Sequence, residues 1–368
     1  MRRPPRASPP AFRRAIAVEQ PRLRYIYWEE LRRGSTTSTA PPAAPLCGIF
    51  LMTIADIQAA RERLSPYLIA TPLVYSFPLS RSAGRKIWLK LETQQPTGSF
   101  KVRPAFHSAI VHLEQARKAG VLASSSGNFA QGVAYAAREL GLDAQIVMTS
   151  NSSPYKMAET ESLGAKVVLC GNTFEDRWET TYRLQRESGR VLLHPYDSPE
   201  TIAGDATLGM ELLEQLPGHF GVITPVSGGG LISGIATALK LCRPQCLVLG
   251  VQPEANGAFR RSLEAGHPVN VGPVRTIADA LVASEPGKNT FEIVRKLVDG
   301  MILVSESEIE AAVRYLALKQ KLVVEPGGAV GVAALLAGKV PSGDTDLVCI
   351  LSGGNVMPAA LVRLLQEQ

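Results

Sequence analysis

The chain has 368 residues, of which 45% are hydrophobic and 20% are charged, a composition typical of a globular protein with one or two cores. The formal net charge of +6 belongs to residues 1–51, because the acidic and basic residues of the remainder cancel. A neutral body lacks the basic surface of a nucleic-acid-binding protein, and no apolar run approaches the roughly 18 residues of a membrane span.

Residues 1–51 are rich in Arg, Pro, Ser and Thr and lack a sustained apolar period, so we expect a disordered tail. Their prolines oppose the amphipathic helix of a targeting presequence, and no long apolar segment precedes a cleavage site. An alternative is that Met52, which opens MTIADIQAARERL, is the true start of the protein.

The cysteines and histidines indicate neither a disulfide framework nor a zinc site. The histidines form no two-residue spacing with a nearby cysteine or carboxylate. Scattered cysteines are typical of free thiols in a reducing compartment, so we expect a cytoplasmic protein. The five cysteines are Cys47, Cys170, Cys242, Cys246 and Cys349.

From Ile54 onwards, short β-branched segments alternate with amphipathic ones. The β-branched segments predict strands at residues 120–124, 144–149, 165–170, 221–226, 247–252 and 346–352. The amphipathic segments predict helices at residues 130–140, 154–163, 173–188 and 206–216. This alternation predicts an α/β protein whose parallel sheets carry helices on both faces. In such sheets, ligands bind beyond the carboxyl ends of the strands.

The segment QPTGSFKVRPA places Lys101 directly after a turn of small residues and at the start of an expected helix. A helix N-terminus and partial burial both favour a neutral amine or an imine over an ammonium ion. Lys101 is therefore a candidate for covalent chemistry. A solvated lysine beside an ordinary N-cap is the alternative that this segment alone leaves open.

A glycine-rich turn follows the strand predicted at residues 221–226. Gly228, Gly229 and Gly230 carry no Cβ, so their backbone N–H groups can converge on a phosphate at the start of the next helix. A dinucleotide is disfavoured, because the spacing is not G-x-G-x-x-G and the next strand ends in Gln252 where an acid would be expected.

Two further loops also follow predicted strands. The SSSGN loop offers hydroxyl, amide and backbone donors for a substrate carboxylate from Ser125, Ser126, Gly127 and Asn128. The LSGGN segment places Ser352 at a strand end beside glycines that admit a flat ligand. Each loop taken alone is also compatible with an ordinary turn.

A lysine for an imine, a phosphate turn, a carboxylate loop and a hydroxyl for a ring nitrogen together suit pyridoxal phosphate chemistry on an amino acid. The sequence resembles the fold type II pyridoxal phosphate enzymes, and among them the threonine/serine dehydratases and serine racemases. The resemblance runs from about Met52 to near the C-terminus, in the family's order. It includes TPLVYS, WLKLETQQPTGSFKVRPA, SSSGNFAQGVAYAA, HPYDSPETIAGDATLGMEL, PVSGGGLISGIA, TIADAL, VVEPGGAVGVAALL and LSGGNV.

The resemblance implies a fold and an organisation into domains. The expected fold has two open, mostly parallel sheets with helices on both faces, similar to the tryptophan synthase beta chain. Residues 52–112 and 196–368 would form a large cofactor-binding domain, and residues 113–195 a small domain. The family also implies a homodimer, and the chain offers no room for an appended regulatory domain.

The resemblance further implies how individual residues bind pyridoxal 5′-phosphate. Lys101 would form the imine with the cofactor, Phe100 would flank its ring, and Asn128 would bond its 3′-oxygen. Ser352 would face the pyridine nitrogen and leave it unprotonated, which suits prompt β-elimination. The phosphate would be held by Gly228, Gly229, Gly230 and Leu231.

The chain departs from the family pattern beside these motifs. Pro104 replaces a glycine, and because proline suits only a first helical turn, the helix must start late or bend next to Lys101. Phe129 and Ala280 add apolar bulk to the expected substrate region and supply no cation, which favours neutral side chains. Metal-dependent relatives have acidic ligands where this chain has Gln252 and Ala258, so we expect no metal site.

The predicted function is a threonine/serine ammonia-lyase that converts a β-hydroxy amino acid to a 2-oxo acid and ammonia, with Lys101 taking the Cα proton. One alternative is a racemase, because Ser126 lies where racemases keep a second base, although serine is also a good helix cap. Another is an α/β ligand-binding protein that lost the chemistry. Retention of Lys101 with all three loops favours an enzyme, with a small amino acid as its ligand.

Overall fold

The computed structural model describes residues 52–366, and the predictions for residues 1–51 lie outside the described residues. Its larger sheet has six strands in the order β1-β2-β10-β7-β8-β9, in which β1 and β2 pair antiparallel and the other neighbours are parallel. These strands are β1 (Leu73–Tyr75), β2 (Ile87–Leu91), β7 (Phe220–Pro225), β8 (Leu247–Pro253), β9 (Gly300–Val304) and β10 (Asp346–Leu351).

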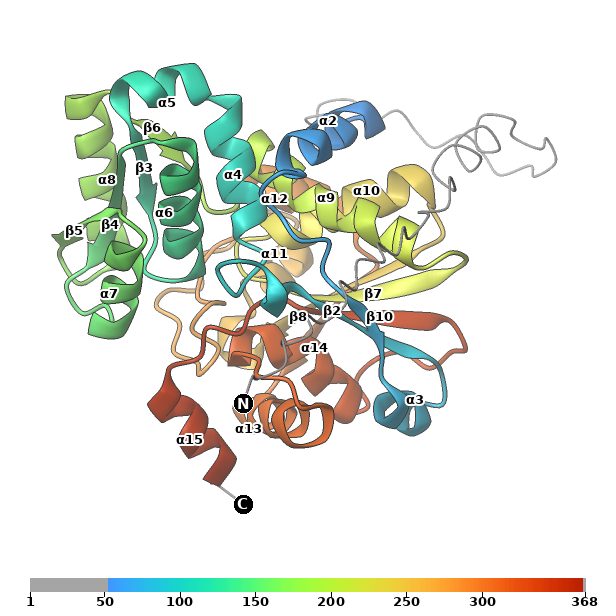
Figure 1. Cartoon of the computed structure of the whole chain (residues 1–368). Coiled ribbons are helices and arrows are strands. Elements are labelled where there is room, and N and C mark those ends of the chain that lie inside the picture. The colour runs from blue at the N-terminus through green and yellow to red at the C-terminus, as the bar shows by residue number, and fades with distance from the viewer. Residues whose placement is uncertain (1–51, 367–368) are drawn as a thin grey trace, which may run out of the picture. The chain divides into compact units, whose positions relative to one another are not determined.

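The smaller sheet is fully parallel, with four strands in the order β5-β4-β3-β6. Figure 1 shows it with its own helices in green, beside the larger sheet. The predicted α/β fold with two open, mostly parallel sheets is confirmed. The four strands are β3 (Val121–Ser124), β4 (Ala144–Thr149), β5 (Lys166–Cys170) and β6 (Val191–Leu193).

Helices connect the strands and cover the sheets. The first group is α2 (Ile54–Leu64), α3 (Phe77–Ala83), α4 (Val102–Val111), α5 (Leu113–Ala119), α6 (Asn128–Leu140), α7 (Pro154–Ser162) and α8 (Phe174–Ser188). The second group is α9 (Pro199–Gln215), α10 (Gly230–Cys242), α11 (Ala258–Ala265), α12 (Lys288–Leu297), α13 (Glu306–Tyr315), α14 (Pro326–Leu336) and α15 (Pro358–Gln366). Single turns of 3₁₀ helix occur at η1 (Glu92–Gln94) and η2 (Glu254–Asn256), and a π-helical turn at η3 (Leu316–Gln320).

Local sequence sets where several of these helices begin. The α9 helix starts at Pro199, well before the predicted residue 206, because the Ser198 side chain accepts a hydrogen bond from the backbone N–H of Thr201. The α4 helix starts at Val102, so Pro104 lies in its first turn, as the sequence requires. Lys101 is therefore at the N-cap of α4.

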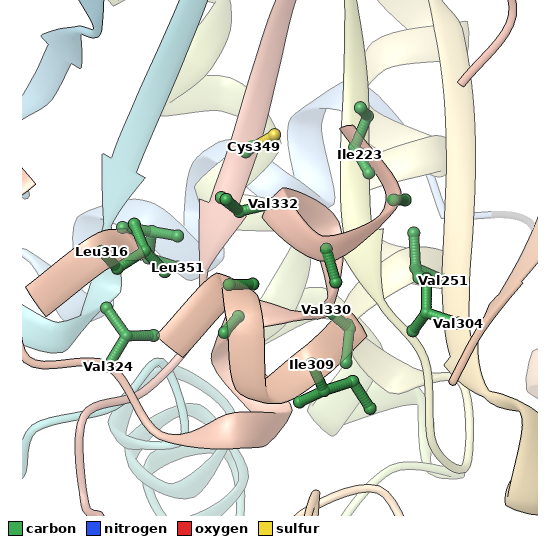
Figure 2. Packing of buried hydrophobic residues seen from close by; sticks show 14 of the residues in the cluster. Ile223, Val251, Val304, Ile309, Leu316, Val324, Val330, Val332, Cys349 and Leu351 are labelled. Atoms are coloured by element: carbon green, nitrogen blue, oxygen red, sulfur yellow. The ribbon is translucent and has the colours of Figure 1, made fainter. Parts of the chain in front are cut away.

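The larger sheet is buried on both faces, because consecutive residues of its central strands enter different cores. Ile223 and Cys349 pack with α14 on one face, and Val222 and Val348 pack with α10 on the other. Figure 2 shows the α14 side, where Val330 and other apolar side chains of α14 meet those of β7, β8, β9 and β10. The α14 sequence PGGAVGVAALL carries no charge, which suits a helix buried over most of its length.

The smaller sheet buries one face against α4 and α6 and the other against α8. Since α4 also packs on α9, which covers the larger sheet, helices link the two sheets. The domain boundaries predicted at residues 112–113 and 195–196 therefore stay a prediction. Among the described helices, none combines the length and apolar character that crossing a membrane requires.

Candidate active site

A cavity of about 430 Å³ lies where β3, β7 and β10 end, which is the edge at which parallel sheets bind ligands. The structure brings all the predicted site residues together in its lining, although they come from four separate segments of the chain. These residues are Phe100, Lys101, Ser125, Ser126, Gly127, Asn128, Gly228, Gly229, Gly230, Leu231 and Ser352. Their roles in binding and catalysis stay predictions.

Lys101 lies in the cavity between two aromatic rings. Its Nζ is 4.8 Å from the ring centre of Phe100 and 5.5 Å from that of Phe129, and it donates a 2.7 Å hydrogen bond to the carbonyl of Pro195. Burial lowers the pKa of Lys101, and the nearby Asp205 carboxyl opposes this shift. Apolar surroundings thus favour the neutral amine that covalent chemistry needs.

The turn before Lys101 is fastened to the loop after β10. Gly98 adopts φ of 69°, which a side chain would strain, and its carbonyl accepts a hydrogen bond from the Gly354 N–H at 2.9 Å. The Phe100 N–H donates to the Ser352 carbonyl at 3.0 Å. These backbone contacts hold Lys101 and Ser352 in the same cavity although the chain separates them widely.

The glycine-rich turn forms the N-terminus of α10. Gly229 is the N-cap with φ of 99°, and a Cβ there would collide with Phe259 and Thr290. The Gly228 carbonyl accepts a 2.7 Å hydrogen bond from the Thr290 hydroxyl, which fixes the turn. Because the first N–H groups of a helix lack intrahelical acceptors, this turn offers a phosphate-sized anion several donors.

Asn128 and Glu325 form a polar pair in the cavity wall. The Asn128 amide donates to Glu325 Oε1 at 2.6 Å, and its carbonyl accepts from Asn355 at 2.9 Å. Burial, together with Asp279, raises the pKa of Glu325 to about 7. The second amide proton of Asn128 remains available to a ligand. Ser352 is buried in the same wall, and its hydroxyl makes no hydrogen bond within residues 52–366.

The carboxylate loop lies beside a cation that the sequence analysis missed. The Ser126 hydroxyl accepts hydrogen bonds from Ser152 at 2.8 Å and from Arg177 Nη1 at 3.5 Å. Burial lowers the pKa of Arg177, whose Nε has no hydrogen-bond partner in the described part of the chain. The argument from Phe129 and Ala280 for a pocket without a cation is therefore wrong. No sequence pattern singles out this arginine on α8, because tertiary packing brings it to the cavity.

Two aromatic residues before α9 complete the wall and were also missed. His194 stacks on Trp178 with ring centres 5.0 Å apart, and burial together with Lys101 lowers the pKa of His194 to about 4. Tyr196 lines the cavity, and burial together with Asp197 raises its pKa to about 12. Both side chains are therefore uncharged near neutral pH.

Gln252 caps a helix. Its Oε1 accepts hydrogen bonds from the backbone N–H groups of Phe259 at 3.1 Å and Arg260 at 3.3 Å, at the start of α11. Within the described range, no three His, Cys, Asp or Glu side chains gather as metal ligands. The expectation that Gln252 and Ala258 bind no metal stays a prediction.

The cavity residues fit pyridoxal 5′-phosphate. The Lys101 amine lies in apolar surroundings, the glycine turn opens α10 toward the cavity, and the Phe100 ring adjoins the amine. The unpaired Ser352 hydroxyl and the second amide proton of Asn128 supply polar groups for a flat heterocycle.

Comparisons with known proteins agree with this geometry. A curated L-threonine ammonia-lyase of Thermotoga maritima is 42% identical over 86% of this chain and 79% of its own. A solved bacterial-type threonine deaminase, from the organism abbreviated T.th., is 45% identical, with a TM-score of 0.77 over 83% of this chain and 99% of its own. Maize serine racemase is 37% identical, with a TM-score of 0.81 over 84% and 95%.

A family model described as pyridoxal-phosphate dependent enzyme matches residues 64–353. This range includes the cavity's lysine, both helix-start loops and the Ser352 segment, which are the groups that the cofactor would contact. The chain therefore belongs to the family of pyridoxal-phosphate dependent enzymes.

Proposed function

We propose that this enzyme is a pyridoxal-phosphate-dependent ammonia-lyase that converts L-threonine and L-serine to a 2-oxo acid and ammonia. The observation that carries the proposal is that Lys101, the glycine turn and the carboxylate loop open into one cavity. The chain is also 42% identical to an L-threonine ammonia-lyase over 86% of its length, which supports this choice of reaction.

The protein's part in cofactor binding follows from the cavity wall. Lys101 would hold the cofactor covalently, beside the Phe100 ring. Asn128 would donate its second amide proton to the 3′-oxygen, and the Ser352 hydroxyl would face the pyridine nitrogen. The phosphate would be held by Gly228, Gly229, Gly230 and Leu231. When bound, pyridoxal phosphate supplies an electron-withdrawing ring that stabilises negative charge at the substrate Cα.

Lys101 is the proposed general base. Once substrate has displaced it from the cofactor, its Nζ is a neutral amine, because the Phe100 and Phe129 rings oppose the ammonium form. Nζ can then take the Cα proton as the β-hydroxyl leaves as water. The resulting enamine tautomerises and is hydrolysed to the 2-oxo acid and ammonia, which balances the reaction.

The substrate carboxylate would bind at the N-terminus of α6, where Gly127 is the N-cap. Backbone N–H groups and the Ser125 and Ser126 hydroxyls converge there, with Asn128 at the first helical position. Arg177 adds positive charge beside Ser126. This arrangement orients the Cα–H bond of the substrate relative to Lys101.

Racemisation is a second candidate, favoured by the position of Ser126. Its hydroxyl lies in the cavity with Lys101 and accepts hydrogen bonds from Ser152 and Arg177. A cation beside a hydroxyl favours its ionised form, which a second acid-base group at Cα requires. Solved relatives with comparable coverage include maize serine racemase as well as a threonine deaminase.

The experiment that tests both candidates is a substrate panel. Holoenzyme receives L-threonine, L-serine, D-serine and 3-hydroxyaspartate, and both 2-oxo acid release and the chirality of the remaining amino acid are measured. We expect 2-oxo acid from L-threonine and L-serine, with overlapping activities, because one or two methyl contacts change discrimination by only about 1–3 kcal/mol. Faster interconversion of serine enantiomers than pyruvate release would make racemisation the main activity.

We further propose that the enzyme works in the cytoplasm as a homodimer. In residues 52–366 the cysteines are free thiols, which suits a reducing compartment. Light scattering of the purified holoenzyme tests the dimer, and a mass matching one chain would contradict it. Fractionation of the source cells tests the compartment.

A further inference from the structure

Asp205 is a buried acid whose side chain has no bonding partner. It lies on α9 with 0% of its surface exposed, and neither carboxyl oxygen has a hydrogen-bond partner among the described residues. An unpaired carboxylate in such a place is strongly disfavoured, whereas a neutral carboxylic acid is tolerated. The fold alone gives no reason for an acid at this position.

The Asp205 side chain points at the glycine turn that would hold the cofactor phosphate. Its Oδ2 is 2.9 Å from the place that a Cβ on Gly230 would take, and Gly230 is the first residue of α10 and lines the cavity. One turn further along α10, a Cβ on Gly234 would stand 2.8 Å from the Asp205 Cβ. These two glycines let α9 approach α10 closely, with the carboxyl at the back of the turn.

The charged groups around Asp205 come from the start of α4 and from η1. Burial raises the pKa of Asp205 to about 7, Lys101 and Arg103 oppose this shift, and Glu92 adds to it. The α10 residues packed against the carboxyl, Gly230 and Gly234, have no titratable side chain. Asp205 thus sits between the Lys101 amine and the N-terminus of α10.

We propose that Asp205 couples cofactor binding to the uptake of one proton, because its carboxyl must be protonated when a phosphate dianion occupies the turn beside Gly230. The inference rests on the proposed function only in that pyridoxal phosphate is the ligand. On binding, one Asp205 oxygen forms an O–H bond with a proton from solvent. A carboxylate there would repel the phosphate in a medium that screens charge weakly. The acid also supplies an O–H donor, directed at the turn.

This coupling has a definite sign. In the apoenzyme Asp205 loses its proton near pH 7, and with the cofactor bound it would lose it at a higher pH. Between those two values the protein must take up a proton to bind. The affinity for the cofactor therefore falls by up to about tenfold for each unit of pH increase. Below the lower value, Asp205 contributes no pH dependence.

The test compares wild-type apoenzyme with Asp205→Asn and with Glu214→Gln. The asparagine keeps the size and a donor but cannot ionise, whereas Glu214 is an exposed carboxylate on the same helix, paired with Arg61. The dissociation constant for pyridoxal phosphate is measured by absorbance from about pH 6 to about pH 9, on either side of the expected transition. Calorimetry in two buffers of different ionisation enthalpy counts the protons taken up.

We expect Asp205→Asn to bind with a weaker pH dependence above neutrality and to take up as much as one proton fewer than the wild type. Glu214→Gln should match the wild type. An unchanged pH dependence and proton count in Asp205→Asn would overturn the inference and leave the proposed function standing. Absence of pyridoxal phosphate binding to the wild type at every pH would overturn both.

A measurement on the wild type alone covers the case in which Asp205→Asn does not fold. Pyridoxal, which lacks the phosphate, replaces pyridoxal phosphate in the same calorimetric titration. We expect the additional proton uptake with the phosphate-bearing ligand and not with pyridoxal. Equal proton uptake with both ligands would show that Asp205 responds to Lys101 rather than to the phosphate, and would overturn the inference.

Discussion

Lys101 and Arg103 lie two positions apart at the start of α4, yet their surroundings differ completely. Arg103 is fully buried, and its guanidinium donates to both oxygens of Glu92 at 2.8 and 2.9 Å and to Glu211 at 2.7 Å. Glu211 in turn accepts from Lys90 at 2.8 Å. Lys101 instead shares its cavity wall with acids that have one partner or none.

Charges in the first group, the Arg103 network, satisfy one another, whereas those around the cavity do not. Lys90 completes its bonding with the Thr71 carbonyl and Gln215 at 2.8 and 2.9 Å. In the cavity wall, Asp205 has no hydrogen bond within the described residues, and Glu325 has one from Asn128. A closed network stabilises a fold and orients α4, while unsatisfied groups await a ligand. The five predictions below separate these two roles.

The largest expected effect is loss of function without loss of fold. Lys101→Ala should abolish the cofactor's visible-edge absorbance and lower turnover by roughly 10³-fold or more, because covalent attachment and the general base both disappear. Thermal unfolding should stay close to that of the wild-type apoenzyme, since Nζ bonds only to the Pro195 carbonyl. Full activity in this variant would refute the proposed mechanism.

Arg103→Met should do the opposite and lower stability first. It leaves Glu92 and part of Glu211 buried without a counterion, which costs about 3–5 kcal/mol of unfolding free energy. The control is Arg61→Met, which breaks an exposed pair with Glu214 and should cost less than about 1 kcal/mol. Urea unfolding measures both, and equal losses would show that the buried network has no special weight.

Ser126→Ala should separate the two candidate reactions. If Ser126 is the second base, interconversion of serine enantiomers should fall by roughly 10²-fold or more. Release of 2-oxo acid from L-threonine should change little, because Lys101 takes the Cα proton of an L-substrate. Coupled assay and chiral chromatography on the same samples give both rates. Racemisation at the wild-type rate would remove Ser126 from acid-base chemistry.

The acids of the cavity wall should make the apoenzyme's stability depend on pH. The Glu325 pKa of about 7 in the folded state lies above that of a free glutamate, near 4.3, so the folded state binds more protons between these values. Unfolding free energy should therefore fall as pH rises from about 4 to about 7 and then level off. Glu325→Gln should reduce this slope, and Glu264→Gln, which alters an exposed acid, should not. Denaturant midpoints across this pH range supply the measurement.

The smallest expected effect is that of a chelator. Gln252 already uses its oxygen to cap α11, and an amide lacks the charge that a hard divalent cation prefers. EDTA should leave the rate with L-threonine within about twofold of the untreated value, and added Mg²⁺ should not raise it. A magnesium-dependent increase in rate would contradict this assignment of Gln252.

The sequence by itself determined the strand and helix alternation, because β-branched and amphipathic periods are local patterns. It also located Lys101 and the three loops, since strand ends, glycine runs and helix starts are visible along the chain. It missed β2, whose segment IWLKL contains the buried Lys90, and β6, which spans just Val191–Leu193. A lysine argues locally against a buried strand, and three residues carry too little pattern.

Tertiary structure alone decided which side chains face the cavity and which of them remain unpaired. Arg177 comes from α8 and Glu325 from the start of α14, and nothing in their own segments predicts a shared wall. Asp205 lies inside a long buried helix, where its missing partners appear only once α4 and α10 are packed around it. Burial, hydrogen bonding and pKa depend on neighbours distant in the chain, and those neighbours exist only in the folded protein.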